Sequence, residues 1–214
     1  MSLSNKKLLN WLSLSGLLAL VFYFLHIFLG VSRYPGYNWM EQAVSDLTAM
    51  DAPSFFIASG YSNLYGGLAC ICCIIVTVSI ENKFNRIFRA GIYLYTIMHS
   101  VSFIGYTMFP LSGKGFQGAF TDIMHLYVVT LSVVLLSILS LILIFTGGIK
   151  HKQTKAVAVL ALIALLVMFA GSIGTGVVPK EYFGLMERLS LFSVVIFTAV
   201  LGLFGYSLSH RADN

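Results

Sequence analysis

The chain is poor in charged residues, and this shortage excludes an ordinary soluble domain. Asp, Glu, Lys and Arg make up 10% of the 214 residues, while hydrophobic residues make up 58%. Soluble globular domains carry about a quarter charged residues. The composition therefore predicts an integral membrane protein, and no stretch of ordinary composition is long enough for a separate soluble domain. We expect one membrane domain over residues 1–214.

Cysteines and recognisable catalytic motifs are also scarce. Cys70, Cys72 and Cys73 are the only cysteines, and all three lie in one apolar stretch, which predicts buried packing residues rather than disulfides. The sequence contains no phosphate-binding loop, dinucleotide-binding fingerprint or serine nucleophile motif. These absences exclude the commonest nucleotide-binding and hydrolase signatures.

The positive net charge does not indicate a nucleic-acid partner. Of the thirteen Lys and Arg residues, nine fall in connections on one side of the predicted bundle: Lys6, Lys7, Lys83, Arg86, Arg89, Lys150, Lys152, Lys155 and Arg211. Basic residues concentrate in cytoplasmic connections of membrane proteins. We therefore expect cytoplasmic N- and C-termini, and no nucleic-acid binding.

Long apolar stretches dominate what is present. Six of them are long enough to cross a bilayer, at about residues 8–31, 55–80, 88–108, 121–145, 156–178 and 184–208. In a membrane the backbone must form its hydrogen bonds internally, so each stretch is expected to be an α-helix. The predicted fold is an all-α, six-helix transmembrane bundle.

Three of the predicted helices end in the same pattern on the outer side. A glycine is followed five residues later by a proline, at Gly30 and Pro35, Gly105 and Pro110, and Gly174 and Pro179. This recurrence suggests three helical hairpins related by an internal repeat. The alternative is that glycine and proline simply end helices, as they commonly do.

The first outer connection, residues 32–54, is long for a compact bundle. Asn38 followed by Glu41 fits a capping box, and an apolar face follows it, so a short helix is expected. Tyr34, Tyr37 and Trp39 suit a segment at the level of the lipid headgroups. This connection is predicted to form a lid or an interfacial helix.

Most ionisable side chains within or beside the spans lie in their outer halves, and such residues are functional candidates. Asp122 and His125 are three residues apart, a spacing at which the carboxylate could orient the imidazole. We hypothesise that His125 acts in acid–base catalysis, with Asp46 or Glu187 as a second carboxylate. The remaining candidates would bind the ligand: Arg33, Arg188, His99, Tyr106, Asn63 and Ser45. The two arginines would bind an anionic group of that ligand. An equally open alternative is a structural ion-pair network that fastens the outer ends of the helices.

Three histidines are candidate ligands for a zinc ion: His26, His99 and His125. The sequence has no HxxxH or HExxH spacing, and a single histidine in a helix is more often a hydrogen-bonded packing residue. A zinc site is therefore one hypothesis beside metal-free catalysis, and the cofactor stays unknown.

The chain resembles the multi-pass prokaryotic membrane proteins catalogued as domain of unknown function 998. The resemblance rests on Ser45-Asp46-Leu47, Phe109-Pro110, His125 and the run from Gly184 to Arg188. It implies a six-helix bundle in the inner membrane of a prokaryotic cell and supports the choice of site residues. It implies nothing about a substrate, because the family has no agreed activity.

Together these observations predict an outward-facing polar cleft, covered by residues 32–54, that binds a membrane lipid or another amphiphile. Metal-assisted or acid–base hydrolysis of that ligand is the catalytic version of the hypothesis. A proton-coupled transporter that uses Asp122, His99 and His125 is an alternative, although the inner halves of the spans supply few polar residues for its route. The third alternative is a structural or assembly protein without catalysis.

Overall fold

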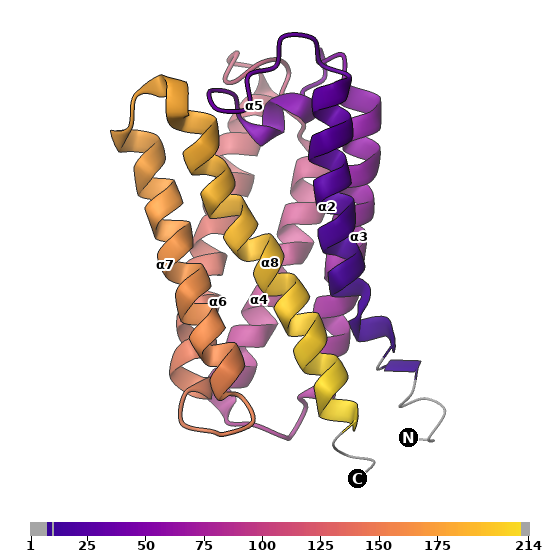
Figure 1. Cartoon of the computed structure of the whole chain (residues 1–214), viewed down its shortest axis with the longest axis vertical. Helices are drawn as coiled ribbons and strands as arrows, with labels where there is room; N and C mark the ends of the chain where they lie inside the picture. The colour runs from indigo at the N-terminus through magenta and orange to yellow at the C-terminus, as the bar shows by residue number, and fades with distance from the viewer. Residues whose placement is uncertain (1–7, 10, 211–214) are drawn as a thin grey trace.

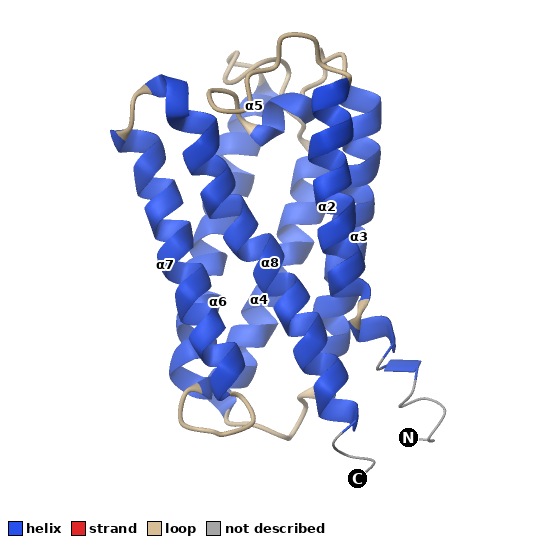
Figure 2. Ribbon diagram, viewed as in Figure 1, coloured by secondary structure: helices blue, strands red, loops and turns tan. Residues whose placement is uncertain are grey.

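The computed structural model describes residues 8–9 and 11–210. Helices and loops make up this part of the chain, and it contains no strand (Figure 2). Six helical segments are long and apolar enough to cross a membrane: Trp11–Ser32, Phe55–Ser79, Arg86–Met108, Phe120–Gly148, Lys155–Val177 and Lys180–Leu208. The expected all-α, six-span architecture is confirmed, with ends shifted by a few residues.

The principal helices are α2 (Ser15–Ser32), α3 (Phe55–Ser79), α4 (Arg86–Met108), α6 (Leu131–Gly148), α7 (Lys155–Val177) and α8 (Phe183–His210). The fourth span is composite, since α6 is preceded by the short helix α5 (Phe120–Ile123) and the π-helical segment η2 (Met124–Thr130). Two 3₁₀ helices, η1 (Val44–Thr48) and η3 (Lys180–Tyr182), lie in the connections.

The helices form three antiparallel hairpins. The most extensive contacts join α2 to α3, α4 to α6, and α7 to α8, and α8 also packs against α2 (Figure 1). Each hairpin turns through a connection at the same end of the bundle, which we call the outer end: residues 33–54, 109–119 and 178–182. The opposite end, with connections 80–85 and 149–154, is called the basic end.

The glycines of the three Gly-to-Pro patterns, Gly30, Gly105 and Gly174, have one packing role in common. The carbonyl oxygen of each accepts the backbone N–H of the residue that ends its helix, at 2.9 to 3.1 Å. A Cβ on Gly105 or Gly174 would lie within 2.7 Å of the side chain of Val129 or Met186, and a Cβ on Gly30 would lie 3.2 Å from that of Leu47. Glycine therefore lets the returning segment approach each helix closely, in addition to marking where the helix ends. This shared role supports the expected arrangement of three hairpins.

The short helix in the first outer connection is present, but it begins later than expected. η1 starts after Ala43, and the backbone N–H of Asn38 donates to the side-chain oxygen of Gln42 rather than to Glu41. The Asn38 side chain accepts a bond from the N–H of Met40, which forms a local turn. The predicted capping box of Asn38 with Glu41 is therefore wrong, because contacts with α8 hold residues 39–42 as turns.

The half of the bundle nearer the basic end is filled by apolar side chains. Its largest fully buried members include Phe88, Ile92, Tyr95, Ile144 and Leu201. Cys72 and Cys73 are buried in the same cluster, and all three cysteines are free, as expected. Interiors of this kind are close-packed.

Candidate functional site

The start of α8 holds the first outer connection in place. The backbone N–H of Leu185 donates to the carbonyl oxygen of Met40 at 3.1 Å. A Cβ at Gly184 would clash with the carbonyl oxygen of Gln42 and lie 2.7 Å from that of Trp39. Only glycine allows the connection to approach α8 this closely. We call residues 37–48 and 184–188 the outer cap.

Arg188 is the central residue of the outer cap. Its Nη1 donates to the carbonyl oxygens of Trp39, Gln42 and Gly184 at 2.6, 2.9 and 2.8 Å, and its Nη2 donates to the Tyr37 hydroxyl at 2.6 Å. The side chain is buried. Its donors are thus directed at the protein's own backbone, and this geometry gives no support to the expected role of Arg188 in binding an anionic ligand.

Tyr37 extends this contact. Its hydroxyl group accepts from Arg188 and donates to the carbonyl oxygen of Ala43 at 2.6 Å. Burial raises the pKa of Tyr37 to about 12, against the opposing effect of the nearby Arg188 charge. The phenol therefore remains protonated at neutral pH and can serve as the donor to Ala43.

Two acids of the outer cap, Asp46 and Glu187, bind backbone N–H groups rather than arginines. Glu187 accepts from the N–H of Val44 at 2.7 Å, and Asp46 accepts from the N–H of Gly115 at 3.0 Å. Burial raises the pKa of Asp46, and hydrogen bonds from the backbone of Gly115 and Ala43 only partly oppose this effect. Asp46 thereby connects the first outer connection to the second.

Asp122 organises the second outer connection. Its carboxylate accepts hydrogen bonds from the N–H and hydroxyl of Ser112, from the N–H of Gln117 and from the N–H of Ala119, at 2.7 to 3.1 Å. It is completely buried. The expected hydrogen bond between His125 and the Asp122 carboxylate is not formed, because these four donors from the loop occupy the carboxylate.

His125 is instead oriented by a backbone carbonyl. Its Nδ1 lies 2.8 Å from the carbonyl oxygen of Phe109, and a carbonyl can only accept, so Nδ1 carries a proton. In the neutral ring, Nε2 then has a free lone pair. His125 lies in η2, and π-helical segments occur frequently at functional sites. Its ring lies 4.7 Å from the ring of Tyr106, whose hydroxyl bonds to Thr130.

The three histidines do not form a metal-binding group. His99 bonds through Nε2 to Thr198 at 2.8 Å, whereas His26 packs edge-on against Tyr23. Within residues 8–9 and 11–210, no three His, Cys, Asp or Glu side chains gather closely enough to hold a metal ion. The geometry therefore gives no support to a zinc site formed by His26, His99 and His125.

Three other predicted ligand-binding residues, Arg33, Asn63 and Ser45, are exposed or half-buried. Arg33 is exposed, and no side-chain hydrogen bond or ion pair joins it to another described residue. Asn63 is also exposed and accepts a bond from Thr107, so it does not face the interior as the stripe of polar residues on α3 suggested. Ser45 accepts from Thr48 through its carbonyl oxygen.

The expected ion-pair network is not what fastens the outer end. In the described part of the chain the one ion pair joins Arg89 to Glu81, near the basic end. The fastening is nevertheless strong, because Arg188, Glu187, Asp46 and Asp122 all bind backbone groups of the connections.

Several polar side chains gather just beneath the outer cap, and one of them, His26, is unsatisfied. His26 is 3% exposed, yet neither ring nitrogen has a hydrogen-bond partner among the described residues. The Tyr23 ring lies 4.8 Å from that of Tyr65, and Glu187 lies close enough to Tyr23 and Tyr106 for electrostatic interaction. We call this group the outer polar cluster; it contains Tyr23, His26, Tyr65, Tyr106, His125 and Glu187.

The sequence did not reveal the contribution of Tyr23 and Tyr65. Buried tyrosines are ordinary packing residues in apolar helices, so neither position stands out. A weak signal was available in the spacing of Tyr23 and His26, which places both on one face of α2. The partners from α3 and α8 became apparent only in the folded structure.

The fold and the outer cap define a polytopic α-helical membrane protein whose outer connections are bound to its own helix ends. Residues 17–203 match the family described as "Protein of unknown function (DUF998)", and the chain belongs to this family. The expected resemblance is thus confirmed. No curated protein and no solved structure matches the chain.

Proposed function

We propose that the protein binds a membrane lipid or another amphiphile, with the polar headgroup of the ligand against the outer polar cluster. The observation that carries the proposal is His26, which is buried with both ring nitrogens unpartnered. A buried polar group without a hydrogen bond costs about 1–3 kcal/mol, and such a cost commonly accompanies a functional site. A ligand headgroup would supply the missing partners.

Two neighbouring groups add to this argument. Only one carboxylate oxygen of Glu187 is used by the outer cap, and Oε1 accepts no bond from any described residue. The Nε2 lone pair of His125 is similarly unused. A hydroxyl, amine or phosphate headgroup could bond to these atoms while its apolar tail remained among the surrounding helices.

The geometry of His125 also supports hydrolysis as the chemical step. In this version, Nε2 takes a proton from a water molecule as the water oxygen attacks an ester carbonyl of the ligand. The proton then passes to the departing alcohol oxygen, which leaves an acid and an alcohol. The hydrogen bond to Phe109 favours this role because it fixes the tautomer with Nε2 free.

The transporter alternative has less support. Proton coupling needs a polar route across the bundle, and the half near the basic end is filled by residues such as Phe88, Ile92 and Leu201. Ser140, one of the few polar residues in this half, is buried and donates to the carbonyl oxygen of Ser137.

The orientation is also inferred. Lys83, Arg86, Arg89, Lys150, Lys152 and Lys155 lie in or beside the connections at the basic end, so we infer that this end faces the cytoplasm of a prokaryotic cell. Membrane-impermeant labelling of Lys114→Cys, compared with Lys83→Cys, tests this orientation.

The binding experiment uses full-length protein purified in a neutral detergent, from which bound lipids are extracted and identified by mass spectrometry. We expect the wild type to retain an amphiphile and Glu187→Gln to retain at least fivefold less. This variant keeps an oxygen for the N–H of Val44, so the outer cap is preserved. The matched control is Glu181→Gln, an exposed acid at the same end, which should retain the wild-type amount.

A second variant separates binding from a structural role. His26→Phe removes the unpartnered imidazole and restores apolar packing, so we expect a higher thermal unfolding midpoint and weaker retention of the amphiphile. A structural histidine would instead lower the midpoint when replaced. Wild-type protein that carries no more amphiphile than a detergent blank would refute the proposal.

A further inference from the structure

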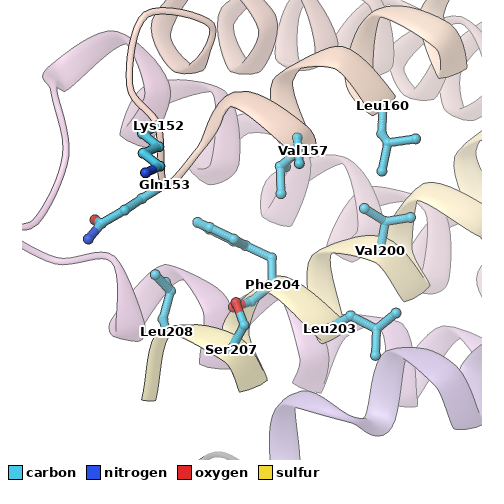
Figure 3. Close-up of a pocket in the computed structure, with 10 residues that line it drawn as sticks. Lys152, Gln153, Val157, Leu160, Val200, Leu203, Phe204, Ser207 and Leu208 are labelled. Carbon is cyan, nitrogen blue, oxygen red and sulfur yellow. The ribbon is translucent and has the colours of Figure 1, made fainter. Parts of the chain in front are cut away.

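A second candidate binding site lies at the opposite end of the bundle. A hollow of about 320 Å³ opens between α7 and α8, within the size range of ligand pockets (Figure 3). Lys152 and Gln153 lie at one end of it, whereas Leu160 and Leu203 lie at the other. The buried ring of Phe204 lies between these ends. The hollow is therefore polar at the membrane boundary and apolar further in.

The polar end carries a positive charge that no described residue compensates. Lys152 is exposed and forms no ion pair with a described residue, since the one ion pair of that part of the chain joins Arg89 to Glu81. Lys150 and Lys155 lie on either side of it, and residues 149–155 contain no acid. An anionic group would thus meet attraction from the whole connection.

The apolar end is continuous with the hydrocarbon region. Leu160 and Leu203 are 39% and 48% exposed, although both lie within membrane-crossing segments. Leu160 is five residues from Lys155, where α7 begins, and Leu203 is five residues from Leu208, where the last span ends. The hollow therefore descends about 7.5 Å along the helices. This depth is about half of one leaflet of the roughly 30 Å hydrocarbon core.

We propose that this hollow binds an anionic phospholipid of the leaflet that meets the basic end. The phosphate would lie against Lys152 and Gln153, and an acyl chain would lie along Leu160 and Leu203. A soluble anion would leave the apolar wall unused, and a neutral lipid would leave Lys152 uncompensated. The site lies at the end opposite to the outer polar cluster and does not depend on the function of that cluster.

The test compares phosphatidylglycerol with phosphatidylcholine on full-length protein in a neutral detergent. Native mass spectrometry gives the apparent affinity for the first bound lipid. We expect tighter binding of phosphatidylglycerol by the wild type and a loss of about fivefold in Lys152→Gln, the effect of one basic residue near a membrane surface. The control Lys150→Gln removes the same charge from the same connection but does not line the hollow.

A second variant tests the apolar wall. Leu203→Trp fills the hollow from an exposed position, so the protein should fold normally and bind both lipids more weakly at this site. Equal affinity of the wild type for the two lipids would overturn the proposal, as would equal losses in Lys152→Gln and Lys150→Gln. A dimer that forms without lipid and is disrupted by Leu203→Trp would assign the hollow to a second copy of the chain instead.

Discussion

Arg188 donates a 2.6 Å hydrogen bond to the carbonyl oxygen of Trp39, which lies 149 positions earlier in the chain. The positive charge of the buried guanidinium is thereby met by backbone dipoles, without a carboxylate partner. The consequence is mechanical, because the first outer connection and the start of α8 are held together. Any movement that opened the outer cap would have to break the bonds of this one side chain.

Replacement of Arg188 should therefore destabilise the protein. In Arg188→Gln the carbonyl oxygens of Trp39, Gln42 and Gly184 lose a charged donor, and we expect a loss of about 2–4 kcal/mol. Thermal unfolding in detergent measures it. The control Arg33→Gln removes an exposed arginine from the same end and should change stability by less than about 0.5 kcal/mol. Equal effects of the two variants would contradict the structural role of Arg188.

Gly184 should tolerate no side chain. Alanine there would place Cβ against the carbonyl oxygens of Gln42 and Trp39, so we expect Gly184→Ala to be destabilising by about 2 kcal/mol or more. Limited proteolysis should show faster cleavage within residues 37–43. Gly176→Ala is a suitable control, since a Cβ there meets nothing within 4 Å and alanine favours the helix. A stable Gly184→Ala variant would show that the cap is not closely bound to α8.

Asp122 should prove to be a stability residue. Asparagine offers one acceptor oxygen in place of the carboxylate that binds Ser112, Gln117 and Ala119, so Asp122→Asn should lose about 1–3 kcal/mol. Hydrogen exchange of the amides at these three positions is the direct measurement, and their protection should fall. Unchanged protection with full thermal stability would return Asp122 to the set of catalytic candidates.

Asp46 should make stability depend on pH. Its pKa is raised in the folded protein by burial, so the folded state binds the proton more tightly than the unfolded chain. Protonation therefore favours folding, and the contribution of Asp46 becomes less favourable as pH rises from about 4 through its folded pKa. We expect the stability of Asp46→Asn relative to the wild type to increase over that range. Unfolding midpoints of the wild type and Asp46→Asn from pH 4 to pH 7, with Glu181→Gln as the control, measure the trend. A fall in the stability of Asp46→Asn relative to the wild type as pH rises would contradict it.

The candidate site was predicted in outline from the sequence, but the roles of its members were not. Asp122 and His125 were paired because they are three residues apart on a helix. The spacing did not show that the loop before the helix would fold back and donate hydrogen bonds to Asp122. It also did not show that the carbonyl oxygen of Phe109 would bond to His125. Both competitors lie in irregular backbone, whose path depends on distant contacts.

The sequence by itself determined the architecture, because hydrocarbon imposes a length and a helical backbone on every apolar crossing. It also located the polar residues at the outer end through the hydropathy pattern. Only the tertiary structure decided which polar atoms are satisfied and which are left open. Arg188, expected to bind a ligand, is occupied by carbonyl oxygens, whereas His26 is left without a partner. The physical reason is that a hydrogen bond forms only when the donor–acceptor distance is correct to within a few tenths of an ångström. These distances are set between segments far apart in sequence, and residue type alone does not specify them.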